Sequence, residues 1–390
     1  MFTGSVLRVC CSDSVKGARQ SRFRLASVAL VLLVTINGAM AESLNADSTS
    51  GNSECIIAAK AGLRAGMQPI EVNAAGPVDV SKSRGKKFAL IQFAREGNPV
   101  EIAHGITVTE AFSHVDAEVL IFDGKGRADI LLQAFESAIA QGVSGIIADG
   151  FDMDVVRGGL AMAVIAGIPV VDVGASVVGG DLAPGVSSYV AVDAFNVGKL
   201  QGYYALAQTN CDLHTAVMPV TGASITVNMA AGTQEAINEL CPHDCSVVPV
   251  QVDPATFLTE LSSQVRTTLQ RDRELNYWIT SADFFTPFIL QGMREAEKVL
   301  PVVGGAQGDG LADAMAGRNG LVATTVWPPA EIKGYMYADA MMRAVAGKPV
   351  NYTTPVRLVD ASVWGDSAEI SAQFPNIAEW KNSFLSAWGL

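Results

Sequence analysis

The sequence has few of the residues and motifs that enzymes use for group transfer. Its 390 residues include only four histidines, and no two of them stand at the spacing of metal ligands. It has no G-x-x-x-x-G-K-S/T loop to hold phosphates and no G-x-S-x-G turn to expose a nucleophilic serine. A single glycine in Ala94-Arg95-Glu96-Gly97-Asn98 does not make a dinucleotide-binding loop. We therefore expect no enzyme activity, no catalytic residue, no cofactor and no metal site.

Apolar runs long enough to cross a membrane are also missing. A membrane-spanning helix needs about 20 apolar residues. The run from Leu25 to Ile36 is shorter. It follows arginines within residues 19–24 and precedes Ala39-Met40-Ala41, which is the order typical of a secretory signal peptide. We expect residues 1–41 to be removed by cleavage after Ala41 and the mature protein to be exported.

Acidic residues outnumber basic residues in residues 42–390, which would remain after cleavage. Five of the 27 basic residues, but of the 39 acidic residues only Asp13, precede residue 42. The remaining 22 basic and 38 acidic residues give a net charge of −16. Such a surface repels phosphate backbones and anionic lipids, so we expect no nucleic-acid partner.

Four cysteines follow residue 41, namely Cys55, Cys211, Cys241 and Cys245. Export permits disulfide bonds. Cys241, His243 and Cys245 would alternatively make a metal clip, but three ligands in one short loop without a fourth are a weak metal signal. We expect one disulfide bond among Cys211, Cys241 and Cys245, with its connectivity left open.

The chain between residues 87 and 325 alternates short apolar runs with segments of helical length. Such alternation predicts a parallel sheet with helices on both faces. In the first half the expected strands are 88–93, 119–122, 145–148 and 168–173, and the helices are 99–112, 128–141 and 154–166. In the second half the strands are 215–220, 246–250, 277–280, 302–304 and 321–325, and the helices are 227–240, 254–270 and 287–299. About ten strands in one open sheet is near the usual limit, so two α/β lobes are expected, each doubly wound around a parallel sheet.

Ligands of such folds bind outside the carboxyl ends of the strands. The segments that follow the strands are 94–100, 123–127, 149–152, 174–178, 221–228, 281–286 and 305–309. Asn98 at a strand end also suits the cap of the next helix, and Asp149 suits the positive end of a helix. Phe284 and Trp327 follow strands in loops, where aromatic rings suit stacking on a flat ligand face.

From about Lys87 to Val359 the chain resembles the type 1 periplasmic binding proteins of ABC transporters, in particular the ribose-type sugar receptors. The resemblance depends on several short motifs in a fixed order. They are Asn98-Pro99, Ala148–Asp152, Ala166–Val171, Asp193 followed by Gly198, Val302-Val303-Gly304 with Gln307-Gly308, and Ala346-Gly347-Lys348.

The resemblance implies two lobes joined by a three-strand hinge, which close around a ligand that a membrane permease then receives. Residues 85–192 and 327–355 would form lobe 1, residues 193–326 and 356–390 would form lobe 2, and residues 42–84 would be an N-terminal extension. The implied protein is a periplasmic monomer. The expected ligand-binding residues are Asn98, Glu101, Asp149, Phe151, Asp193, Asn228, Asp283, Phe284, Gln307 and Trp327.

Three positions depart from the pattern of the sugar receptors. Gly174-Ala175 stands where an Asp-Arg pair is usual, Ala231 replaces a second arginine, and Gln307 replaces an aspartate. Bidentate arginine contacts are a main source of affinity for hydroxyl groups. The expected function is capture of a small polar solute, carbohydrate or polyol-like, for an ABC importer. The alternative is a periplasmic sensor that signals to a receptor kinase or chemoreceptor.

Overall fold

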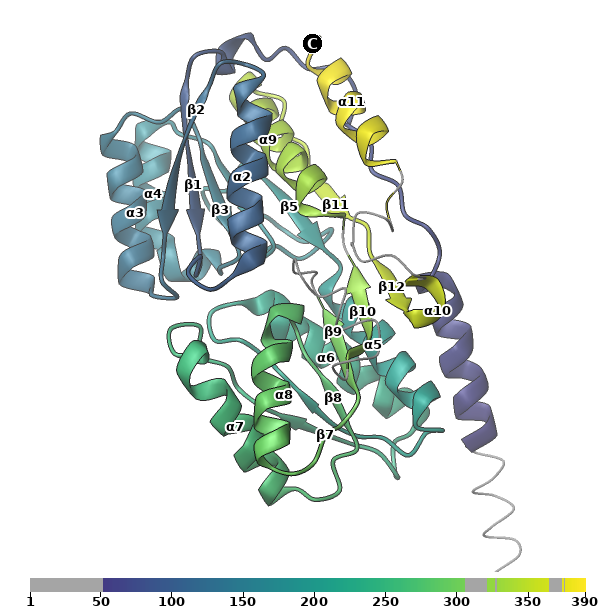
Figure 1. Cartoon of the computed structure of the whole chain (residues 1–390). Coiled ribbons are helices and arrows are strands. Elements are labelled where there is room, and N and C mark those ends of the chain that lie inside the picture. The colour runs from purple at the N-terminus through teal and green to yellow at the C-terminus, as the bar shows by residue number, and fades with distance from the viewer. Residues whose placement is uncertain (1–51, 306–320, 327, 365–373, 375) are drawn as a thin grey trace, which may run out of the picture. The chain divides into compact units, whose positions relative to one another are not determined.

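The computed structural model describes residues 52–305, 321–326, 328–364, 374 and 376–390 (Figure 1). All of them belong to the unit Asn52–Leu390. The expected signal peptide, Gln307 and Trp327 lie outside the described residues. Among the described helices, none combines the length and the hydropathy needed to cross a membrane.

The first sheet has six parallel strands in the order β11-β5-β4-β3-β1-β2. They are β1 (Lys87–Gln92), β2 (Glu118–Asp123), β3 (Ile146–Asp149), β4 (Val170–Val173), β5 (Ser188–Val192) and β11 (Tyr352–Thr354). Helices α2 (Pro99–Ser113) and α9 (Ala330–Ala346) pack together on one face, and α3 (Ala128–Ala140) and α4 (Arg157–Ala166) pack together on the other (Figure 1). The inner strands are buried on both faces, which explains their nearly continuous apolar sequences.

The second sheet has six strands in the order β12-β10-β9-β8-β6-β7, and only β12 runs antiparallel to its neighbour. They are β6 (His214–Val217), β7 (Ser246–Pro249), β8 (Tyr277–Ile279), β9 (Val302–Gly305), β10 (Leu321–Val326) and β12 (Arg357–Asp360). Helices α5 (Ala194–Gln208) and α6 (Ser224–Leu240) form one pair, and α7 (Phe257–Arg271) and α8 (Thr286–Glu295) form another.

The chain passes between the two sheets after β5, after β10 and between β11 and β12. We call the first sheet with α2, α3, α4 and α9 lobe 1, and the second sheet with α5 to α8 lobe 2. The expected fold class, two doubly wound lobes joined by three strand crossovers, is confirmed.

Glycines set the contact between α5 and α6. A Cβ atom added to Gly198 would lie 1.8 Å from the Met229 carbonyl oxygen, and one added to Gly232 would lie 1.9 Å from that of Phe195. Any side chain there would clash with backbone, so the two helices touch directly. This contact fixes where α6 lies in lobe 2.

The C-terminal segment corrects the expected domain boundary. Residues 356–390 are expected in lobe 2, and among the described residues of this segment β12 and the short helix α10 (Ala361–Trp364) do lie there. Helix α11 (Ile377–Ala387) packs on α9 of lobe 1. The Trp388 indole nitrogen donates to Asp339 at 2.7 Å, and the ring stacks on Tyr335 with centroids 5.7 Å apart. Burying these aromatic rings on lobe 1 determines the position of the helix.

The N-terminal extension also contacts both lobes. A helix over residues 52–66 packs on lobe 2, where Cys55 is bonded to Cys211. The chain then reaches lobe 1, where the Val78 amide donates to the Ala387 carbonyl at 2.8 Å and Gly76 accepts from Arg343. Figure 1 shows this extended segment beside α11.

The disulfide bond expected in the trio is present as Cys241–Cys245, with Cα atoms 5.6 Å apart. Their sulfur atoms are bonded to each other and are not available as a metal clip. The second bond, Cys55–Cys211, joins residues 156 positions apart, and the sequence did not indicate this pairing.

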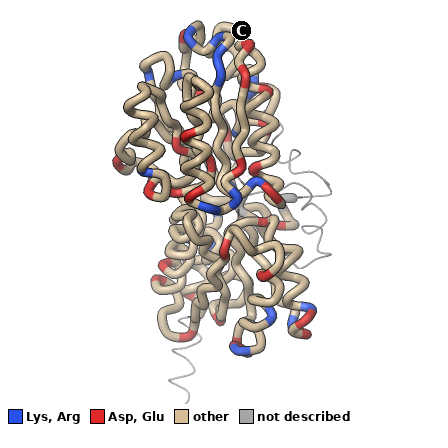
Figure 2. Tube along the Cα trace, turned by 90° about the vertical axis from the view of Figure 1, so that its left-hand side faces the viewer, with Lys and Arg blue, Asp and Glu red and all other residues tan. Residues whose placement is uncertain are grey.

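Figure 2 shows that charged residues of both signs are interspersed along the described chain. Several of them form ion pairs between elements, such as Lys199–Glu239 at 2.8 Å and Arg266–Glu295 at 3.2 Å. Pairs at this level of exposure contribute little to stability. The ionisable side chains of Glu101, Asp149 and Lys333 are instead buried.

Candidate functional site

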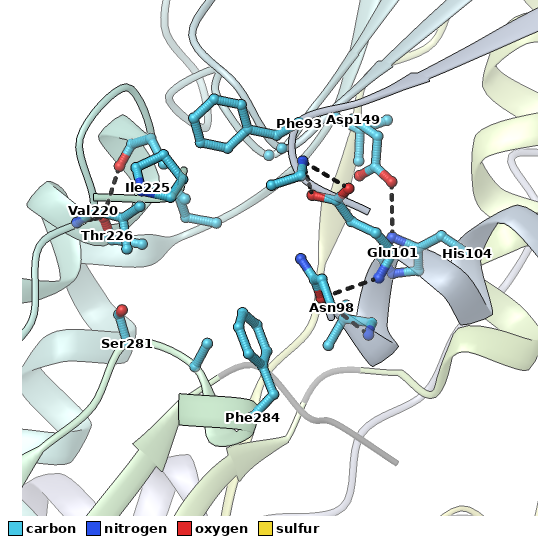
Figure 3. A pocket seen from close by; sticks show the side chains of 18 of the residues that line it. Phe93, Asn98, Glu101, His104, Asp149, Val220, Ile225, Thr226, Ser281 and Phe284 are labelled. Carbon is cyan, nitrogen blue, oxygen red and sulfur yellow. Dashed lines mark hydrogen bonds and ion pairs between the residues drawn. The ribbon is translucent and has the colours of Figure 1, made fainter. Parts of the chain in front are cut away.

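A cavity of about 150 Å³ lies where the carboxyl ends of strands from the two sheets meet (Figure 3). This size matches that of cavities in proteins that hold one six-membered ring, which are on the order of 150 Å³. Lobe 1 contributes Phe93, Ala94, Asn98, Val100, Glu101, His104, Asp149, Gly150, Val173, Gly174, Val190, Val192, Lys333, Tyr337 and Thr354. Lobe 2 contributes Val220, Ala223, Ile225, Thr226, Met229, Pro254, Phe257, Ser281, Ala282, Phe284 and Phe285.

The start of α2 places two polar residues at the cavity. The Asn98 side-chain oxygen accepts from the amides of Val100 and Glu101 at 3.1 and 3.3 Å, which caps the helix. Pro99 at the first helical position has its backbone angle already set for a helix. One turn later the Glu101 carboxylate oxygens accept from the Ala94 amide at 3.1 and 3.3 Å.

Glu101 is buried, and this burial raises the pKa of its carboxyl well above the ordinary value. The negative charge of Asp149 raises it further. The neutral acid is therefore favoured, and a neutral carboxyl both donates and accepts hydrogen bonds. Glu101 can then bind a ligand hydroxyl as either partner.

Asp149 ends β3 and holds the neighbouring polar side chains. Its Oδ2 lies 3.0 Å from His104 Nδ1 and accepts from the Gln92 amide nitrogen at 3.1 Å. Burial alone would raise the pKa of Asp149, but the contacts with His104 and Gln92 and the charge of Lys333 hold it below the ordinary value. Burial, followed by the charge of Lys333, lowers the pKa of His104, so a neutral ring donates from Nδ1.

Helix α9 adds two buried residues from far along the chain. A Cβ atom on Gly334 would lie 2.3 Å from Thr107 Oγ1, so glycine lets α9 approach α2 closely. Burial lowers the pKa of Lys333 to about 8, although Asp149 opposes this shift. The Tyr337 hydroxyl lies 3.5 Å from His104 Nε2, and burial raises the pKa of this phenol well above its usual range.

The wall from lobe 2 is mostly apolar. Thr226 uses its hydroxyl locally, because it donates to the Ala223 carbonyl at 2.8 Å and accepts from the Val220 amide at 2.7 Å. The Ser281 hydroxyl is buried and has no hydrogen-bond partner among the described residues. Figure 3 shows Ser281 on the opposite side of the cavity from Glu101.

The structure brings four of the expected ligand-binding residues, Asn98, Glu101, Asp149 and Phe284, to the cavity. Asp193 and Asn228 line a neighbouring hollow, which shares Gly174, Val192 and Ile225 with the cavity. Asp193 also caps α5 by accepting from the Asn196 amide at 3.1 Å.

Phe151 and Asp283 are fully buried and do not line the cavity. Phe151 packs in the core of lobe 1, with its ring centroid 6.3 Å from that of Phe93. Asp283 accepts from the Thr324 hydroxyl at 2.8 and 2.9 Å inside lobe 2. The expectations for Gln307 and Trp327 fall outside the described residues.

Sequence reasoning missed His104, Ser281, Lys333 and Tyr337 as lining residues. His104 stands three residues after Glu101 on the same helix, so an i,i+3 pattern would have indicated it. Ser281 lies in the expected loop 281–286, but serine is common in loops. Lys333 and Tyr337 follow no strand end, and no local signal marks them.

A family model described as periplasmic binding protein domain matches residues 105–349, which is more than half of the chain. Comparison with curated protein sequences gave no match. Many solved structures share the fold.

One similar structure is an ABC transporter solute-binding protein of Mycobacterium smegmatis with bound glycerol, at 19% identity and a TM-score of 0.62, over 73% of this chain and 98% of the other. A second, from Bacillus halodurans with bound myo-inositol, has 17% identity and a TM-score of 0.62, over 77% and 99%.

A third structure is the fructose-binding periplasmic domain of a hybrid two-component system, at 17% identity and a TM-score of 0.63, over 78% and 99%. At these identities the structures establish the shared fold only. The family model and the two-lobed architecture agree: the chain belongs to the periplasmic binding protein domain family, with the type 1 fold.

Proposed function

We propose that the protein is the solute-binding component of an ABC importer and captures one small hydroxylated solute in the cavity between its lobes. The observation that carries the proposal is the cavity itself, which residues from both lobes line at the ends of their strands. A ligand held there contacts both lobes, so its binding free energy favours the closed arrangement.

The chemistry of the cavity supports binding of a neutral molecule. Lys333 and Asp149 are both buried beside it, and their opposite charges offset one another. Glu101 favours its neutral form because it is buried. A charged ligand would leave an uncompensated charge out of water, which costs several kcal/mol or more.

The test is a binding screen with the mature secreted protein. Thermal shift against a panel of small metabolites should identify a ligand, because a ligand at 100 times its Kd adds about 2.7 kcal/mol to the free energy of unfolding. Calorimetry should then give a stoichiometry of one. Deletion of the gene should abolish uptake of the radiolabelled ligand. A panel without a binder, or uptake that is unchanged, would contradict the proposal.

One observation favours a second candidate function. A structure with the same fold is the periplasmic domain of a hybrid two-component system. In that case the ligand would bind in the same cavity, but deletion would leave its uptake unchanged and would abolish transcription that the ligand induces.

A further inference from the structure

We propose that the cavity selects a ring-sized ligand with an apolar body and few hydroxyl groups, such as an alicyclic diol, over inositols and sugars. This inference rests on the proposed function and specifies its ligand. Glu101 on lobe 1 and Ser281 on lobe 2 would each bind one hydroxyl group of the ligand.

The first argument concerns how few hydrogen bonds remain available among the described residues. Asn98 uses its oxygen to cap α2. Asp149 Oδ2 is engaged by His104 and Gln92. Thr226 is engaged by backbone. Among the described residues, the side-chain oxygens of Glu101 accept from the Ala94 amide alone, which leaves hydrogen-bonding capacity on both of them.

The second argument is Ser281. Its hydroxyl is buried in the cavity wall and has no partner in the described part of the chain. A buried hydroxyl without a partner is costly, and a ligand hydroxyl would satisfy it. Figure 3 places Ser281 and Glu101 on facing sides of the cavity, so one ligand hydroxyl would suit each point.

The third argument is the apolar surface between these two points. Ile225, Met229 and Phe284 line the cavity on the side of lobe 2, and Phe93 lines it from lobe 1. Each further ligand hydroxyl facing them would lose its hydrogen bonds to water without replacement, at a cost of about tenfold in affinity or more.

Matched ligands of three kinds test the proposal, because they all share one six-membered carbon ring. They are cyclohexanol, the positional isomers of cyclohexanediol, and myo-inositol. Calorimetry with the mature protein should show at least one diol binding 100-fold or more tightly than myo-inositol. Equal or tighter binding of myo-inositol would overturn this inference and leave the proposed function standing. Absence of binding by all of them would overturn the inference. The proposed function would fall only if the metabolite screen is empty or uptake is unchanged by the deletion.

A variant of Ser281 tests where the second hydroxyl group of the diol binds. Ser281→Ala should weaken binding of the preferred diol about tenfold and leave cyclohexanol unchanged within about twofold, which excludes a general loss of folding. Ser137→Ala, at an exposed position of α3, is the matched control and should leave the affinity for both ligands unchanged. If Asn228→Ala, in the neighbouring hollow, weakens the diol and Ser281→Ala does not, the ligand lies in the hollow and the proposal is wrong. Equal weakening of diol and cyclohexanol by Ser281→Ala would also overturn it.

Discussion

The two walls of the cavity differ in chemistry and in how they are built. Glu101, His104, Asp149, Lys333 and Tyr337 all belong to lobe 1, whereas the wall from lobe 2 has no titratable side chain among the described lining residues. The polar network therefore forms within one lobe. Its members do not depend on lobe 2, which adds a mostly apolar cover and the Ser281 hydroxyl and keeps water from the hydrogen bonds inside.

The largest expected effect comes from breaking the polar wall at Asp149. Asp149→Ala removes the acceptor of His104 and Gln92 and leaves Lys333 without its nearby negative charge. Removing one member of a buried charge network costs about 3–5 kcal/mol of the free energy of unfolding. Urea denaturation measures this loss. Asp149→Asn keeps the shape and one acceptor, so it should lose less, and equal losses for both would contradict this account.

The next effect is a pH dependence that belongs to the polar wall alone. Burial lowers the pKa of Lys333 to about 8, below its ordinary 10.5. The folded protein then releases this proton before the unfolded chain does, so Lys333 by itself contributes a rise in stability of up to about 3 kcal/mol between pH 8 and pH 10.5. Lys333→Met should remove this rise relative to the wild type. Met229→Leu, a variant in the apolar wall, should keep the rise in stability. If Lys333→Met also keeps the rise, another group causes it.

A smaller loss of stability should follow from a shift of α6, which carries part of the apolar wall. Gly232→Ala would place a Cβ atom 1.9 Å from the Phe195 carbonyl oxygen and push α6, which bears Met229, away from α5. Such overpacking costs about 1–3 kcal/mol. Gly158→Ala on α4 is the control, since its Cβ atom would meet only Leu132 Cδ1 at 3.5 Å. That variant should be neutral or slightly stabilising because alanine favours a helix. Similar losses for both variants would show that crowding is not the cause.

The smallest expected effect concerns a single ring of the apolar wall. Phe284 is half-buried and lies against Phe285 with centroids 4.4 Å apart. Phe284→Ala should weaken binding of the ligand found by screening about tenfold, equivalent to about 1.4 kcal/mol. The melting temperature should change little, because the core beneath remains filled by Phe257 and Phe285. Unchanged affinity in calorimetry would show that the ligand does not touch this wall.

The sequence predicted those elements whose signal is local. The helix expected at 128–141 is α3 at Ala128–Ala140, and Gly142 with a positive φ of 69° follows its end. The strand expected at 88–93 is β1 at Lys87–Gln92. The alternation missed β12 and α11, because the position of each depends on a partner elsewhere: β12 pairs antiparallel with β10, and α11 packs on α9.

The candidate site shows the same division. Asn98, Asp149 and Phe284 were found because they follow strands, and parallel strands bring their carboxyl ends to one edge. The same rule also selected Phe151 and Asp283, which are fully buried. Position after a strand does not reveal which way a side chain points.

What the sequence alone determined is the repeated pattern of buried strands and helices, and with it the two-lobed fold and the edge where ligands bind. This follows because apolar period and helix ends are properties of neighbouring residues. Only the tertiary structure decided the chemistry of the cavity. Lys333 meets Asp149 across 184 positions because Gly334 lets α9 lie against α2, and Ser281 faces Glu101 because two lobes meet. Burial, which lowers the pKa of Lys333 and raises that of Glu101, depends on the packing of the whole chain.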